Sequence, residues 1–239
     1  MQKILGIIGG MGSEAAVNMF HTIVSSTKAD YDQQHLEIVI HNNSQVPDRT
    51  KAIMTSGPSP VPELQRSVKM LERCGVDCII IPCMTAHHYF SDIQSVTGIT
   101  VINAIKETVQ VITDAGDVTK VGILATTGTI HTGLFQNALN AAGITSLIPN
   151  EAEQQDLVMD AIYGVDGVKA GYSQGPPKVK LVEAAGRLIG RGAEYLIAGC
   201  TEVPLALKQE DISVPLIDPI KILACKAITS CDGHIKDAY

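Results

Sequence analysis

The apolar positions of the chain fall into short runs of aliphatic residues, separated by turn residues and amphipathic stretches. Three consecutive isoleucines, Ile79–Ile81, predict a strand that is buried on both faces, and Pro82 ends it. Cys83, Met84 and Thr85 then lie at the carboxyl end of this strand, before the next helix begins. Parallel sheets carry their chemistry at this end of their strands. The pattern therefore predicts an α/β fold and indicates where its site lies.

A second run of the same form occupies residues 195–202, with the sequence YLIAGCTE. Its apolar strand ends at Gly199, and Cys200, Thr201 and Glu202 follow. The chain thus has two strands that each lead into a cysteine-containing turn, so we expect the two cysteines to have related roles.

The N-terminal stretch KILGIIGGMGSEAA predicts a strand, a glycine turn and a helix. The strand covers Ile4–Ile8, and the helix begins at about Ser13, whose hydroxyl could cap it. Such a helix N-terminus can hold a carboxylate or a phosphate. The glycines also fit a dinucleotide-binding pattern, but the next strand, Leu36–Ile40, ends without an acid that could hold a ribose. A tight turn without any ligand remains the alternative.

The segments between these motifs read as further helices, strands and loops. A long loop rich in proline, TSGPSPVPEL, should border a site rather than a core. Arg49 lies just before it, after Pro47 and Asp48. A short strand, ITVIN, ends near Asn103, and the other predicted helices are Glu63–Arg73, Glu151–Tyr163, Lys178–Arg191 and Ile220–Thr229.

The strand, turn and helix of the N-terminus recur at residues 121–135, VGILATTGTIHTGLF. Gly128 follows Gly12 by 116 residues, and Cys200 follows Cys83 by 117. Such a constant offset indicates an internal duplication, in which each half is a small parallel α/β unit.

We therefore predict two pseudo-symmetric domains, the first formed by residues 1–103 plus 212–239 and the second by residues 104–211. Their equivalent strand ends should face each other across a cleft that holds the site. The segments ITVINA and VPLIDP are each a short strand that leads into a helix, and one of them could cross back to complete the first sheet.

Composition narrows the function. The 239 residues, 45% of them hydrophobic, are enough for real cores, while a net charge of -7 argues against nucleic-acid and anionic-membrane partners. No signal peptide and no membrane-spanning run is recognised, so we expect a soluble cytoplasmic protein. The six cysteines are then expected to be free thiols.

Two thiols on opposite sides of a substrate could act as base and acid on opposite faces of one carbon, as stereoinversion requires. A cysteine just before a helix can have its pKa lowered by the helix N-terminus. The alternatives are a disulfide, a metal pair and inert packing. A metal pair is disfavoured because His87 and His88 follow Cys83 without a matching pair near Cys200. We interpret the two histidines as packed residues or helix N-terminal donors.

Four motifs occur in order across the chain: GGMG at residues 9–12, PDR at 47–49, PC-x-TAH at 82–87 and GCTE at 199–202. In this combination and spacing the chain resembles the aspartate/glutamate racemase family. The resemblance implies an enzyme that needs no cofactor, neither pyridoxal phosphate nor metal. It also implies that Cys83 and Cys200 act as the base and the acid.

The resemblance further implies how the substrate is held. Thr85, Thr201 and the backbone around Met11 and Ser13 would bind the α-carboxylate and the amino group. Arg49 and Lys169 would bind the side-chain carboxylate, and Met84 and Glu202 complete the expected substrate-binding set. Two alternatives stay open: Arg49 could be a solvated charge or a partner of Asp48, and Lys169 a solvent-facing loop lysine.

The chain departs from the family pattern at two positions. Ser13 replaces the usual proline, which should be mild because serine favours helix starts. Met84 replaces the usual asparagine and so removes an amide that could hydrogen-bond the substrate.

We predict a racemase of an acidic amino acid, aspartate or glutamate, that acts as a homodimer and has neither a nucleic-acid nor a membrane partner. The first alternative is a cysteine-dependent isomerase of an unsaturated dicarboxylate such as maleate. The second is a binding protein that keeps the fold but has lost turnover, for which Met84 is the sequence hint.

Overall fold

Eight strands form two four-stranded sheets in residues 3–236, the part of the chain that the computed structural model describes. Every pair of neighbouring strands in these sheets is parallel. The strand orders are β2-β1-β3-β4 and β6-β5-β7-β8, so the two sheets have the same topology. The predicted α/β class with two similar sheets is confirmed. The strands are β1 (Ile4–Gly9), β2 (Glu37–Asn42), β3 (Cys78–Ile80), β4 (Thr100–Val101), β5 (Lys120–Leu124), β6 (Thr145–Leu147), β7 (Tyr195–Ala198) and β8 (Leu216–Ile217).

Helices connect the strands, as parallel pairing requires. The α-helices are α1 (Ser13–Ser26), α2 (Arg49–Met54), α3 (Val61–Arg73), α4 (Phe90–Gln94), α5 (Ala104–Asp114), α6 (Thr127–His131), α7 (Leu134–Ala141), α8 (Glu151–Glu153), α9 (Asp160–Tyr163), α10 (Pro176–Gly190), α11 (Val203–Ala206) and α12 (Pro219–Ser230). The 3₁₀-helices are η1 (Asp32–Gln34), η2 (Met84–Tyr89), η4 (Val168–Ala170) and η5 (Gln209–Asp211), and η3 (Gln154–Met159) is a π-helix.

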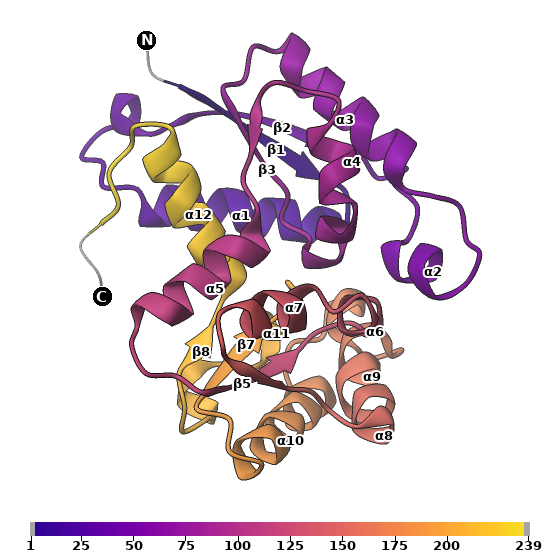
Figure 1. Cartoon of the computed structure of the whole chain (residues 1–239). Helices are drawn as coiled ribbons and strands as arrows, with labels where there is room; N and C mark the ends of the chain where they lie inside the picture. The colour runs from indigo at the N-terminus through magenta and orange to yellow at the C-terminus, as the bar shows by residue number, and fades with distance from the viewer. Residues whose placement is uncertain (1–2, 237–239) are drawn as a thin grey trace. The chain divides into compact units, whose positions relative to one another are not determined.

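The chain divides into two compact units. The first comprises residues up to Glu107 together with those from Ile220 onward, and the second comprises Thr108–Pro219. In the first unit α3 and α4 lie on one side of the sheet, and α1 and α12 lie on the other (Figure 1). Apolar side chains of α3 pack against isoleucines of β1 and β3, including Leu64, Val68, Ile8 and Ile79.

The core of the second unit lies between its sheet and α10. Leu181, Ala185 and Leu188 of this helix are buried against Leu124 of β5 and Leu196 of β7. The π-helix η3 lies between α8 and α9 in the chain, and its Val158 is buried in the same core.

Neither short strand crosses between the sheets. β4 pairs with β3 in the first sheet, and β8 pairs with β7 in the second, so the expectation that one of them crosses back to complete the first sheet is wrong. The chain therefore returns to the first unit only at α12, later than the residue 212 suggested by the sequence.

One local expectation also differs from the structure. Gly12 takes the N-cap position of α1, and the Ser13 hydroxyl instead accepts a hydrogen bond from Asn42 Nδ2 at 2.9 Å. Arg49–Met54 forms the short helix α2, for which no prediction was made from the sequence. Asp48 starts this helix, because its carboxylate accepts a hydrogen bond from the Lys51 N–H at 2.7 Å. None of the helices in the described range is long and apolar enough to cross a membrane.

Candidate active site

Cys83 follows β3 after Ile81 and Pro82, at the carboxyl end of the strand. Its side chain is only 7% exposed, and η2 begins at the next residue. The Cys83 carbonyl accepts hydrogen bonds from the Ala86 N–H at 3.2 Å and from His87 Nδ1 at 3.0 Å. These bonds fix the backbone of the thiol-bearing turn.

His87 joins this turn to the start of α5. Its Nε2 accepts a hydrogen bond from the Ala104 N–H at 3.1 Å, so the ring proton must be on Nδ1, which donates to Cys83. Burial lowers the pKa of His87 and keeps the ring neutral, as both hydrogen bonds require. The interpretation as a packed residue is confirmed for His87, whereas His88 is exposed and is not a packed residue.

Met84 and Thr85 follow Cys83 in η2, and both are buried. Met84 therefore buries an apolar thioether at the position directly after Cys83, where the family pattern would place an amide.

Met11 and Arg49 are in direct contact. Gly10 has a φ of 91°, and a Cβ there would lie 2.2 Å from the Asn43 backbone, so the turn before Met11 requires glycine. The Met11 carbonyl accepts a hydrogen bond from Arg49 Nη2 at 3.1 Å, and the Pro47 carbonyl accepts one from Nη1 at 3.1 Å. Arg49 is 9% exposed, so its interpretation as a solvated charge is wrong.

Cys200 follows β7 after Gly199, and it is 8% exposed. A Cβ on Gly199 would lie 2.9 Å from the Ala125 Cβ and 3.1 Å from a ring carbon of Phe135. The Gly199 N–H donates to the Leu124 carbonyl at 2.8 Å. The glycine thus lets the Cys200 turn approach the end of β5 closely.

The Cys200 thiol is hydrogen-bonded to Glu202, and Glu202 in turn binds Thr201 and Lys169. Cys200 Sγ and Thr201 Oγ1 each donate to Glu202 Oε2 at 2.8 Å. Lys169 Nζ donates to Glu202 Oε1 at 2.6 Å and lies 5.2 Å from the centre of the Tyr163 ring. The Lys169 side chain is 26% exposed and paired with Glu202, so this loop lysine is a partly buried ion-pair partner rather than a purely solvated charge.

The charges of this cluster determine its protonation. Burial, followed by the negative charge of Glu202, raises the pKa of Cys200 well above its usual value, and Lys169 opposes them only in part. Burial also acts to raise the pKa of Glu202, but Lys169 and the hydrogen bonds outweigh it and the net shift is downward. For Lys169, burial acts to lower the pKa, and Glu202 and Cys200 more than compensate and raise it.

The resting cluster is therefore a neutral thiol, a carboxylate and an ammonium. The expectation that a helix N-terminus lowers the thiol pKa is wrong for Cys200. The helix that follows, α11, has only four residues, while a carboxylate lies 2.8 Å from the sulfur.

The structure groups the expected site residues into two sets, one in each unit. Met11, Ser13, Arg49, Cys83, Met84 and Thr85 belong to the first unit, and Lys169, Cys200, Thr201 and Glu202 belong to the second. Within the described residues, no three His, Cys, Asp or Glu side chains form a group that could hold a metal ion.

Sequence reasoning missed the interactions around the turn that follows β5. Thr127 lies 116 residues after Met11, so the internal repeat marks this turn as the counterpart of the Met11 turn. Gln154 Nε2 donates to the Ala125 carbonyl at 2.9 Å and to Thr127 Oγ1 at 3.3 Å. The repeat offset would have identified Thr127, but no sequence signal identifies Gln154.

Solved racemases have this fold. The structure of the aspartate racemase from Picrophilus torridus is 29% identical and matches with a TM-score of 0.85, over 98% of this chain and 96% of that one. An aspartate racemase homologue from Pyrococcus horikoshii is 26% identical, with a TM-score of 0.77, over 97% of this chain and all of the other (100%). The broad specificity amino-acid racemase RacX of Bacillus subtilis is 24% identical over an alignment of 243 positions, which covers 95% of this chain and 97% of RacX.

The fold and these relatives define the class of the protein: it is an amino-acid racemase, an isomerase. Residues 8–227 match the Asp/Glu/Hydantoin racemase family, and the chain belongs to that family. The resemblance indicated by the four sequence motifs is thereby confirmed.

Proposed function

We propose that the protein interconverts the enantiomers of an acidic amino acid, aspartate or glutamate, with Cys83 and Cys200 as the two proton-transfer groups. The observation that carries the proposal is the equivalent placement of the two thiols. Each lies at the carboxyl end of the third strand, in chain order, of a sheet with the same topology. A duplicated fold with one thiol per half supplies one acid and one base.

In this mechanism one cysteine, as the thiolate, removes the Cα proton, and the other, as the thiol, delivers its own proton to the opposite face. The product carries the new proton, and the two cysteines have exchanged protonation states. The raised pKa of Cys200 favours its thiol form, which suits it to act as the acid first. Glu202 accepts the hydrogen of this thiol and so helps to hold Cys200 in the acid form; Cys200 acts as the base in the reverse direction, after it has given its proton to Cα.

The charged groups of the site suit an acidic substrate. Arg49 offers a buried guanidinium in the first unit, and Lys169 offers an ammonium in the second. A guanidinium binds a carboxylate through two parallel hydrogen bonds. Thr85, Thr201 and the Met11 turn would hold the α-carboxylate and the amino group. The P. torridus relative is an aspartate racemase, which agrees with this choice of substrate class.

The proposal is tested by proton NMR in heavy water with each enantiomer of aspartate and glutamate. Deuterium should enter Cα as the opposite enantiomer forms. Unsaturated diacids such as maleate are run in parallel, and turnover of maleate without Cα exchange of any amino acid would instead support the isomerase. Tight aspartate binding without exchange would identify a binding protein.

Cys83→Ser and Cys200→Ser should each abolish racemisation, since a serine hydroxyl is far too weak a base. Cys74→Ser is the matched control, because Cys74 is exposed and should tolerate the change. Racemisation near the wild-type rate in either of the first two variants would contradict the two-thiol mechanism.

A further inference from the structure

Gln154 begins the π-helix η3, a widened helical turn of a kind that often occurs at functional sites. The first and last residues of this π-helix, Gln154 and Met159, both form hydrogen bonds to the turn that follows β5. Gln154 Nε2 donates to the Ala125 carbonyl and to Thr127 Oγ1, and the Thr127 N–H donates to Met159 Sδ at 3.2 Å. The π-helix therefore places the Gln154 amide against this turn.

This turn lies beside the cysteine of the second unit. Leu124 of β5 pairs with Ala198 of β7, and the next residues, Ala125 and Gly199, come so close that a Cβ on Gly199 would lie 2.9 Å from the Ala125 Cβ. Cys200 follows Gly199 directly. The Gln154 amide is thus bonded to the immediate neighbour of the thiol-bearing turn.

The oxygen of this amide lacks a donor. Gln154 is 7% exposed, and its Oε1 is buried without a hydrogen-bond partner anywhere in residues 3–236. Exchanging the amide oxygen and nitrogen would not help, because Oε1 would then face the Ala125 carbonyl oxygen. A buried amide oxygen without a donor is costly, so a group from outside the chain should supply one.

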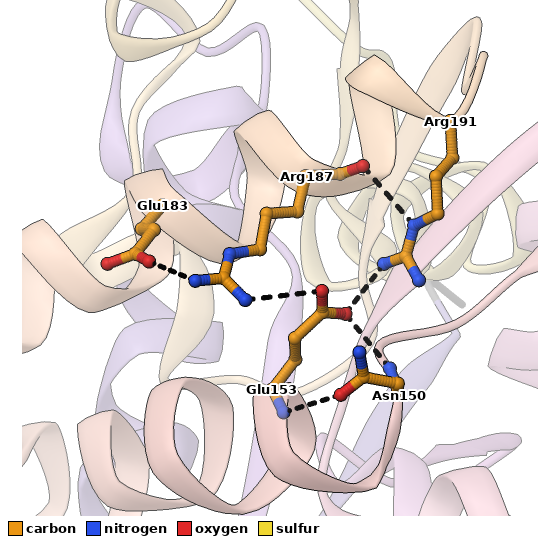
Figure 2. Close-up of polar contacts among 5 residues, drawn as sticks. All are labelled: Asn150, Glu153, Glu183, Arg187 and Arg191. Carbon is orange, nitrogen blue, oxygen red and sulfur yellow. Dashed lines mark hydrogen bonds and ion pairs between the residues drawn. The ribbon is translucent and has the colours of Figure 1, made fainter.

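The helix start before Gln154 is held firmly. Figure 2 shows Glu153 accepting from the Asn150 N–H at 2.9 Å, from Arg191 at 2.8 Å and from Arg187 at 3.4 Å. The Glu153 N–H in turn donates to Asn150 Oδ1 at 2.9 Å. These contacts fix the backbone from which Gln154 extends, and burial together with the two hydrogen bonds of its own Nε2 leaves the side chain little freedom to turn Oε1 elsewhere.

We propose that Gln154 Oε1 accepts a hydrogen bond from the α-ammonium group of an amino-acid substrate bound beside Cys200. This inference rests on the proposed function, since it assumes that the substrate is an amino acid. An ammonium group donates hydrogen bonds, whereas a carboxylate at neutral pH only accepts them. Gln154 therefore discriminates in favour of an amino acid and against a dicarboxylate that has no amine.

The test compares two ligands that differ in the amine. Calorimetry gives the Kd of L-aspartate and of succinate, its deaminated counterpart, for wild type and for Gln154→Leu, which removes the amide at similar size. We expect the aspartate Kd to rise tenfold or more and the succinate Kd to change less than twofold. An equal loss for both ligands would mean that Gln154 only supports the turn, and the inference would be overturned.

The matched control is Gln155→Leu, which makes the same change at an exposed position of the same π-helix, and both Kd values should stay unchanged. Gln154→Met is the second variant, for the case that leucine prevents folding. A crystal structure of the wild-type protein with L-aspartate needs no variant. An amine nitrogen within hydrogen-bond distance of Oε1 supports the inference, and a water on Oε1 with the amine held elsewhere overturns it.

Turnover is measured separately, so the two proposals fail in different ways. Aspartate binding that depends on Gln154, without Cα exchange, would refute the racemase while supporting the amine contact. Racemisation with an aspartate Kd that Gln154→Leu does not change would support the racemase and refute the amine contact.

Discussion

The Cys200 thiol donates its hydrogen to a carboxylate oxygen of Glu202 at 2.8 Å. Together with burial, this negative charge holds the pKa of Cys200 high, so a reaction that needs the Cys200 thiolate should accelerate as pH rises through an alkaline value.

Glu202→Gln should shift that rise to lower pH. The variant removes the negative charge and leaves the Lys169 ammonium near the sulfur, and both changes favour the thiolate. The measurement is kcat/KM against pH for each enantiomer. Glu210→Gln, at an exposed position of the same unit, should leave the profile in place. An unmoved Glu202→Gln profile would show that Glu202 does not control this thiol, and a shift to higher pH would contradict the expected direction of its effect.

Arg49→Ala should raise KM for an acidic amino acid by about 10- to 100-fold, because the substrate carboxylate loses a bidentate partner worth roughly 1.5–3 kcal/mol. Arg66→Ala is the control, since its side chain is 49% exposed and pairs with Glu63 on the surface of α3. Melting temperatures must be recorded as well, because Arg49 also holds the Met11 carbonyl. A folded Arg49→Ala variant with an unchanged KM would remove Arg49 from the substrate site.

Met84→Asn should raise kcat/KM for aspartate or glutamate roughly tenfold or more, since one hydrogen bond to substrate contributes about 1–3 kcal/mol. The wild-type protein should then be weak on these substrates or prefer one with more apolar bulk near Cα. Met84→Leu keeps the apolar wall and should change little. If Met84→Asn gives equal or lower turnover, the backbone alone holds the substrate at this position.

Glu153→Ala should lower the free energy of unfolding by roughly 1–2 kcal/mol at neutral pH, because a helix cap and partly buried ion pairs are lost (Figure 2). Burial acts to raise the pKa of Glu153, but the Asn150 N–H and the two arginines outweigh it and the net shift is downward. The contribution is therefore present above the ordinary glutamate pKa of about 4.3 and is lost as pH falls through the lower folded value.

Denaturant unfolding of wild type and Glu153→Ala at several pH values checks this, and the difference between them should shrink below about pH 4. Glu183→Ala removes the exposed contact to Arg187 in the same network, and it should cost no more than about 0.5 kcal/mol. A difference that stays constant down to pH 2 would mean that the Glu153 charge contributes nothing.

The sequence predicted best what local patterns determine. The strand, glycine turn and helix at the N-terminus appear as β1 and α1, and the helix predicted from Lys178 appears as α10. Here the apolar periodicity and the turn residues agree with each other, so local preference and tertiary packing give the same answer.

It predicted less well what depends on contacts between distant residues. The pairing of Lys169 with Glu202 joins residues 33 positions apart, and nothing near either residue indicates the other. The π-helix at Gln154 lies inside a stretch whose pattern reads as an ordinary helix, because a one-residue widening hardly changes apolar periodicity. The pairing of β8 with β7 likewise depends on the free edge that β7 offers, because the two residues of β8 do not specify a partner.

The path of the chain has a consequence for how the protein folds during synthesis. The second unit is one continuous segment, whereas the first contains α12, which is made after the whole of the second unit. Leu223, Ala224 and Ile228 of α12 are fully buried, so the first unit leaves apolar surface uncovered until this helix has emerged from the ribosome. The half of the protein that is begun first is thus expected to be the half completed last, and a chain that stops before Pro219 should yield a folded second unit beside an unfinished first one.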